Sequence, residues 1–201
     1  MILPPGDYRY EIRLRGDLVA IEQMRLSAGA IAGIRQEADG RTRLEIDASL
    51  EADGAVRRVS LRYASSLFKR AAAYEASEDN FRGSVSALAG RNEIVIKLGR
   101  FREVDVTGLT LFRALIVARV RGRGQPRWTG RVAVIDANTL VAASLKQTCR
   151  KRDEAGSLWI YETRMGDTEE IELDEAGRLI KRRDSRGGEA ALAEFKSAPN
   201  L

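Results

Sequence analysis

The sequence contains no histidine, a single cysteine and only four prolines among its 201 residues. Without histidine, the commonest general base and metal ligand are missing, and so is every Ser-His or Cys-His nucleophile arrangement. Cys149 cannot form a disulfide or a multi-cysteine metal site within one chain, so we interpret it as a small apolar strand residue. These absences argue against an enzyme, and we expect neither a cofactor nor a metal site.

Long apolar runs are also missing, because no segment approaches the roughly 18 apolar residues of a membrane-spanning helix. Residues 1–6 include neither a basic region nor the apolar core of a signal peptide. We therefore expect a cytoplasmic protein without a transmembrane segment, although an exported protein whose leader had been removed would show the same sequence. The sequence makes no prediction of oligomeric state.

Aromatic residues are scarce at 6%, and the net charge of +5 is not concentrated in a basic tail or arm. Nucleic-acid binding usually combines a wide basic stripe with aromatic side chains on which bases stack. The composition therefore argues against nucleic acid as a partner.

Four short turns, in which acidic residues precede a glycine, are the most informative feature that is present. Asp-Gly and related pairs supply the positive φ angles of β-hairpins, and the flanking stretches alternate apolar and charged residues. We interpret Asp39, Asp53, Glu154 and Glu175 as turn residues rather than as an acid–base pair. The four turns cover residues 37–40, 51–54, 153–156 and 174–177.

This pattern predicts an all-β, mainly antiparallel fold, with a curved sheet that forms a β-roll or half-barrel. One helix near 107–119 interrupts the sheet, because Leu109, Phe112, Leu115 and Ile116 recur at helical offsets; a buried strand is the alternative. The tail at 189–195 is expected to form a second, short helix. The expected strands cover 8–15, 18–26, 31–36, 41–50, 55–64, 71–76, 81–88, 93–98, 101–106, 128–136, 140–149, 158–165, 169–173 and 178–183.

The length of the chain suits a single domain, residues 1–201, with a core of its own. Both halves contain meanders with the same style of turn, so we also consider two structurally similar halves joined near 107–127.

The chain resembles two sets of bacterial proteins. The resemblance rests on Tyr8-Arg9-Tyr10-Glu11-Ile12 and Gly16 at the start, and on Trp159-Ile160-Tyr161 and the 171–180 hairpin near the end. One set is the half-open β-barrel lipoprotein carriers, and the other is the spiral β-roll family described as glycolipid-binding. The resemblance implies a curved sheet that wraps an apolar cavity, and it carries over no catalytic residue.

A stretch without acidic residues, between Asp105 and Asp136, contains six arginines. With no carboxylate nearby in the sequence, these arginines are expected to produce a positive potential that attracts phosphate or an anionic lipid head group. The alternative is a solvated loop that follows a core helix. The candidate ligand-binding residues of this stretch are Arg121, Arg123, Arg127 and Trp128.

The remaining candidates are aromatic side chains, which serve either as core residues or as a cage around a ligand, with the core favoured. The leading function is non-enzymatic binding of an apolar or amphipathic molecule, such as a lipid or glycolipid, inside the curved sheet. The alternatives are a structural or protein-interaction module and, third, a carboxylate-dependent enzyme that acts on a glycan or lipid. The aromatic candidates are Tyr8, Tyr10, Tyr63, Trp159 and Tyr161, with Phe68 weighed beside them.

Overall fold

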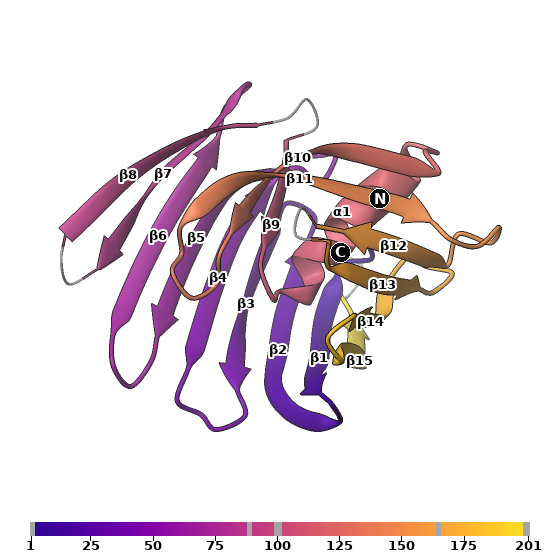
Figure 1. Ribbon diagram of the computed structural model, residues 1–201, viewed down its shortest axis with the longest axis horizontal. Helices are drawn as coiled ribbons and strands as arrows, with labels where there is room; N and C mark the ends of the chain where they lie inside the picture. The colour runs from indigo at the N-terminus through magenta and orange to yellow at the C-terminus, as the bar shows by residue number, and fades with distance from the viewer. Residues whose placement is uncertain (1–2, 88–89, 99–101, 164–165, 199–201) are drawn as a thin grey trace.

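The computed structural model describes residues 3–87, 90–98, 102–163 and 166–198. They form fifteen strands and one helix, α1 (Thr110–Gly122), which confirms the all-β prediction (Figure 1). The expected strand ends at residues 88, 101 and 164–165 lie outside the described residues. The strands are β1 (Gly6–Leu14), β2 (Asp17–Ser27), β3 (Ala30–Glu37), β4 (Arg43–Leu50), β5 (Val56–Ala64), β6 (Lys69–Ala76), β7 (Asn80–Ala87), β8 (Gly90–Lys97), β9 (Glu103–Val106), β10 (Arg127–Ile135), β11 (Ala142–Lys151), β12 (Leu158–Glu162), β13 (Thr168–Leu173), β14 (Leu179–Asp184) and β15 (Gly188–Ser197).

All fifteen strands belong to one curved sheet, in the order β8-β7-β6-β5-β4-β3-β2-β1-β15-β14-β13-β12-β11-β10-β9. Strands β1 to β8 form one antiparallel meander and β10 to β15 form another, and the two meanders are joined where β15 pairs with β1. The exception to antiparallel pairing is β9, which runs parallel to β10 because α1 connects the two strands as a crossover. The sheet is open, and its edge strands are β8 and β9.

The acidic turns have the geometry that the sequence predicts. Gly40, Gly54, Gly156 and Gly177 all have positive φ angles, between 72° and 84°. The preceding aspartates accept backbone N–H groups within these turns; Asp39, for example, accepts the N–H of Arg41 at 2.9 Å. The structure confirms this role for Asp39 and Asp53, whereas in the other two turns Asp153 and Asp174, rather than Glu154 and Glu175, accept the backbone N–H groups.

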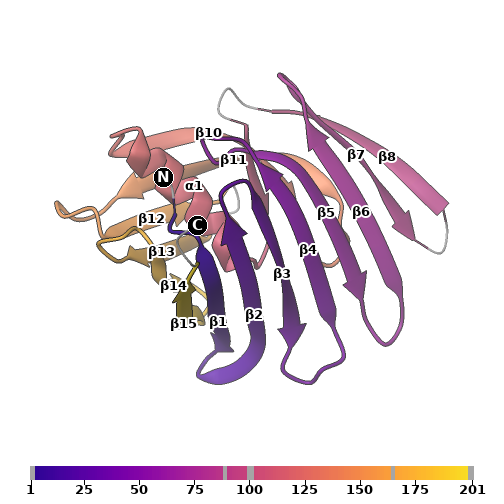
Figure 2. The same ribbon diagram turned by 180° about the vertical axis from the view of Figure 1, so that it is seen from behind.

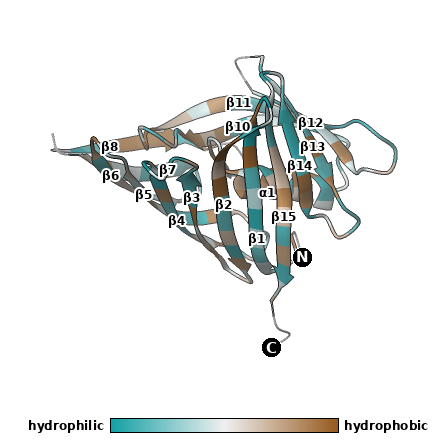
Figure 3. Cartoon of the chain, turned by 90° about the horizontal axis from the view of Figure 1, so that it is seen from below, coloured by the Kyte–Doolittle hydropathy of each residue, from teal (hydrophilic) through white to brown (hydrophobic). Residues whose placement is uncertain are grey.

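Helix α1 fills the concave side of the sheet, where the two meanders curve around it (Figures 2 and 3). It begins three residues later than expected, but the prediction of one interrupting helix is confirmed. Every residue from Leu109 to Val120 is buried, because β1–β3 and the β10–β15 meander enclose the helix. A helix that is apolar on most of its surface is suited to such a buried position.

The prediction of a short helix at 189–195 is wrong, because these residues belong to strand β15. The segment has high helix propensity, with four alanine and leucine residues between two glutamates. Pairing with β1 on one side and β14 on the other satisfies its backbone groups and buries Ala190, so tertiary context overrides propensity.

Candidate ligand-binding site

Five of the seven aromatic residues considered from the sequence lie in the core, away from the hollow described below. Each is at most 5% exposed. Trp159 Nε1 donates to the carbonyl of Gly156 at 3.0 Å and the Tyr161 hydroxyl bonds to Gln147, whereas the Tyr10 hydroxyl and Trp128 Nε1 have no hydrogen-bond partner among the described residues. The structure thus places them in one buried core cluster, and Tyr8 also lines a separate surface hollow beside Arg9 and Gln23. These five are Tyr8, Tyr10, Trp128, Trp159 and Tyr161.

The expectation that no carboxylate neutralises the six arginines is wrong for three of them, Arg113, Arg119 and Arg123. Arg119 on α1 lies 2.6 Å from Glu103 and 2.8 Å from Asp53, and Arg123 lies 3.3 Å from the same Glu103. Glu103 lies on β9, just before the acid-free stretch, whereas Asp53 comes from the turn before β5 and is distant in sequence. Of the candidates in this stretch, Arg121 and Arg127 are exposed.

Arg113 is buried among charged and polar groups of the core. Its guanidinium lies 2.7 Å from the carboxylate of Asp105, 3.6 Å from that of Glu169, and 4.0 Å above the ring centroid of Tyr161. Burial raises the pKa of Asp105, although the Arg113 cation opposes the shift. We assign this group a structural role, because none of its residues lines the surface hollow that is described next.

A hollow with a volume of about 750 Å³ lies around the turn between β5 and β6. The turn is built by Ser65, whose hydroxyl accepts the N–H groups of Leu67 at 3.3 Å and Phe68 at 3.2 Å. Ser65 N–H also donates to the carbonyl of Phe68 at 3.0 Å. This small turn fixes Leu67 at the tip of the hairpin with 85% of its surface exposed.

An aromatic pair forms the apolar wall of the hollow. The rings of Tyr63 and Phe68 stack with centroids 5.5 Å apart and an interplanar angle of 22°. The guanidinium of Arg70 lies 4.3 Å from the Phe68 centroid, in the geometry of a cation–π contact. Of the aromatic residues considered from the sequence, Tyr63 and Phe68 line this hollow.

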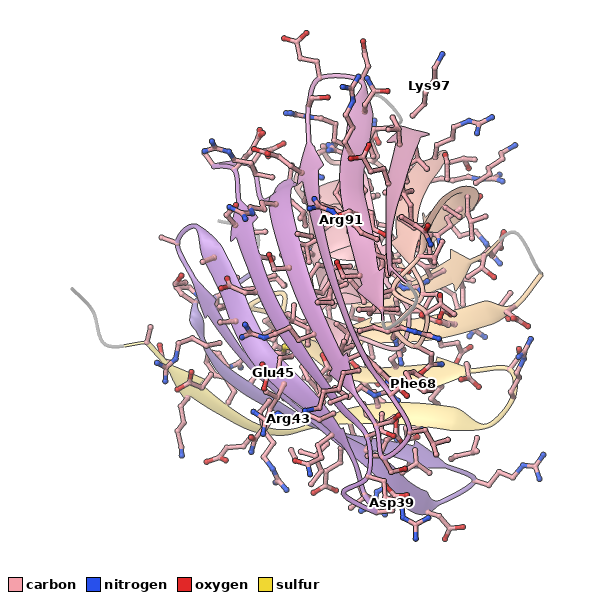
Figure 4. The ribbon with its side chains drawn as sticks, turned by 90° about the vertical axis from the view of Figure 1, so that its left-hand side faces the viewer. Asp39, Arg43, Glu45, Phe68, Arg91 and Lys97 are labelled. Atoms are coloured by element: carbon pink, nitrogen blue, oxygen red, sulfur yellow. The ribbon has the colours of Figure 1, made fainter. Side chains whose placement is uncertain are left out.

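Four cationic side chains and one carboxylate also line the hollow. Glu45 accepts ion-pair contacts from Arg43 at 3.1 Å and from Arg62 at 2.9 Å, so one carboxylate is shared between two guanidinium groups. Arg70 donates to the carbonyl of Asn138 at 2.9 Å, and Lys69 has no partner among the described residues. Figure 4 shows this side of the molecule, with Arg43, Glu45 and Phe68 labelled. The positive charge therefore exceeds the negative charge here.

Sequence reasoning missed most of this hollow. The available signal was a Leu67-Phe68 pair inside a serine-rich turn, followed at once by Lys69 and Arg70. Apolar residues at a hairpin tip are unusual, because turns normally carry polar residues. The contribution of Arg43 had no local signal, since it depends on β4 pairing with β5.

Within the part of the chain that the structure describes, no three His, Cys, Asp or Glu residues are grouped so that they could hold a metal ion. Cys149 is buried in β11, and burial raises the pKa of its thiol to about 12. This agrees with its interpretation as an apolar strand residue. Among the described helices, none is long and apolar enough to cross a membrane.

No protein-family model matches this chain, and no curated protein sequence matches it significantly. Its fold is similar to that of a DUF1089 family protein from Pseudomonas aeruginosa, with a TM-score of 0.62, 20% identity, and coverage of 82% of this chain and 89% of that chain. It is also similar to a β-barrel-like protein of the domain of unknown function DUF1849 from Brucella abortus, with a TM-score of 0.60, 12% identity and 98% coverage of both chains. At these identities the likeness shows a shared fold, and neither name states a ligand or an activity.

Proposed function

We propose that this protein binds an anionic amphipathic molecule, of the lipid or glycolipid class, without transforming it chemically. The ligand occupies the hollow at the β5–β6 turn rather than the concave side of the sheet, which α1 fills. The observation that carries the proposal is an apolar wall that is surrounded by cations. Exposed Leu67 and half-buried Phe68 form this wall, and Phe68 stacks on the largely buried ring of Tyr63.

The apolar part of the ligand packs against this wall. A volume of about 750 Å³ lies within the range of roughly 300–1,000 Å³ that is usual for small-molecule sites. Leu67, Phe68 and Tyr63 supply the apolar surface, and Ala71 and Ala87 leave room on the neighbouring strands. Burial of an acyl chain here would be favourable by about 25 cal/mol for each Å² removed from water.

The anionic part of the ligand contacts the cations at the rim. Lys69 is available for a head group without breaking an existing ion pair, and Arg43 and Arg62 share a single carboxylate. Arginine binds carboxylate and phosphate in a bidentate manner, which gives orientation as well as affinity.

A binding titration with a fluorescent C12 fatty acid and its neutral methyl ester tests this proposal. Phe68→Ala removes part of the apolar wall and should weaken the binding of both probes by about tenfold, a loss of roughly 1.4 kcal/mol. The double variant Lys69→Gln/Arg70→Gln should weaken the binding of the fatty acid alone.

The double variant Arg131→Gln/Lys146→Gln is a matched control, because it removes an exposed arginine and an exposed lysine from the facing strands β10 and β11. It should leave both affinities unchanged. If the wild-type protein binds neither probe, or if the control variant weakens binding as much as Lys69→Gln/Arg70→Gln does, the hollow is not the ligand site.

A further inference from the structure

Strand β8 is an edge of the sheet, and its sequence is unusually suited to pairing. The three consecutive β-branched residues Ile94, Val95 and Ile96 have high strand propensity. Ile94 and Ile96 pack against the core, whereas Val95 points outward with 60% of its surface exposed. Edge strands of this kind are templates for pairing with another chain.

The hydrogen-bond pattern shows which backbone groups β8 presents to solvent. Leu98 N–H donates to the carbonyl of Asp79 at 2.9 Å, and Leu98 lies directly after β8. Because hydrogen-bonded and non-hydrogen-bonded pairs alternate in an antiparallel ladder, the backbone groups of Glu93, Val95 and Lys97 point away from β7. Within the described residues these groups have no backbone partner.

We propose that β8 pairs with β8 of a second copy of this chain, in an antiparallel arrangement about a two-fold axis at Val95. This register places Val95 opposite Val95 of the partner subunit. Glu93 then lies opposite Lys97 of the partner subunit, and the symmetry repeats this contact on the other side of the axis. Both side chains are exposed, and neither has an ion-pair partner among the described residues of its own chain.

Charge disfavours the registers that are shifted towards the start of β8. A register shifted by two residues places Arg91 opposite Lys97 of the partner subunit. A register shifted by two more residues in the same direction places Glu93 opposite Glu93 of the partner subunit. Both juxtapose like charges, which destabilise a directly opposed pair. Figure 4 shows Arg91 and Lys97 on the side of the molecule where β8 lies. The register centred on Val95 instead pairs opposite charges twice.

Sedimentation equilibrium of the full chain tests this pairing. The wild-type protein should reach twice its monomer mass of 22.2 kDa as its concentration rises. Glu93→Lys and Lys97→Glu should each weaken the dimer by about tenfold or more, because each converts two attractive contacts into two repulsive ones. The double variant Glu93→Lys/Lys97→Glu should restore it, and so should an equimolar mixture of the two single variants.

Glu175→Lys, which makes the same charge change in the exposed turn between β13 and β14, is the control and should dimerise like the wild type. Circular dichroism of each variant confirms that it is folded. A wild-type protein that stays monomeric at about millimolar concentration would overturn the proposal. So would a dimer that is insensitive to both single substitutions, or one that the double variant does not restore.

Discussion

The carboxylate of Glu22, on β2, accepts a hydrogen bond of 2.9 Å from the backbone N–H of Thr110, in the first turn of α1. It also accepts the N–H of Leu111 at 3.2 Å. Leu109, at the N-cap position of the helix, provides no side-chain hydrogen bond. A strand residue 88 positions earlier in the sequence therefore caps the helix and fixes it against the first meander.

Glu22→Ala should lower the free energy of unfolding by about 2 kcal/mol, because two buried backbone donors lose their acceptor. Glu22→Gln should cost less, about 1 kcal/mol, since the amide oxygen still accepts one of them. Urea denaturation measures both changes. Equal stability of the wild type and Glu22→Ala would show that the cap does not hold the helix.

The pH dependence of stability gives a second test of the same group. Burial raises the pKa of Glu22 above its ordinary value, although the two backbone hydrogen bonds oppose the shift. The folded state therefore binds a proton more tightly than the unfolded chain does, so the contribution of Glu22 to stability increases as the pH falls from the raised pKa towards 4.5. The stability difference between the wild type and Glu22→Gln should grow over this interval, as urea denaturation at successive pH values would show. A difference that shrinks as the pH falls would contradict the direction of the shift.

The buried ion pair of Arg113 and Asp105 should show strong coupling. Asp105→Asn removes the nearest counter-charge of a guanidinium that is 4% exposed, and should destabilise the protein by about 3–5 kcal/mol. The double variant Arg113→Met/Asp105→Leu should recover part of this loss, because it removes both members of the buried pair, although the half-buried Glu169 then loses its contact with Arg113. A double-mutant cycle from urea denaturation measures the coupling, and additive costs would show that the two side chains act independently.

The arginines that the sequence singled out can be separated from those of the hollow. Replacement of Arg121, Arg123 and Arg127 with serine should leave the affinity for the C12 fatty acid within about twofold of the wild type, because none of the three lines the hollow. Stability should fall slightly through loss of the contact between Arg123 and Glu103. A selective loss of affinity for the anionic probe would instead support the site that the sequence predicted.

Most of the sheet could be predicted from the sequence, because its signals are local. The alternation of Leu44, Ile46 and Ala48 with charged residues, and the glycines of the acidic turns, specify strands and hairpins without knowledge of the rest of the chain. For residues 189–195 the local pattern predicts a helix, which is wrong because pairing with β1 decides their conformation.

The site could not be predicted in the same way, because it depends on contacts between distant residues. Glu103 and Asp53 neutralise Arg119 only after β9 and the turn before β5 have come to lie against α1. The sequence around Trp159 and Tyr161 does not distinguish aromatic side chains that line a cavity from aromatic side chains that pack in a core, where the structure places both. Whether a given aromatic residue is accessible is therefore decided by the tertiary fold.

The most direct test of the proposed function is an NMR titration of the ¹⁵N-labelled protein with dodecanoate, kept below its micelle concentration. The account predicts that amide chemical-shift changes are concentrated in residues 62–71, with smaller changes at Arg43 and Glu45, and that they saturate at one ligand per chain. Changes centred on α1 and on the strand residues Trp159 and Tyr161, or no saturable change anywhere, would contradict it.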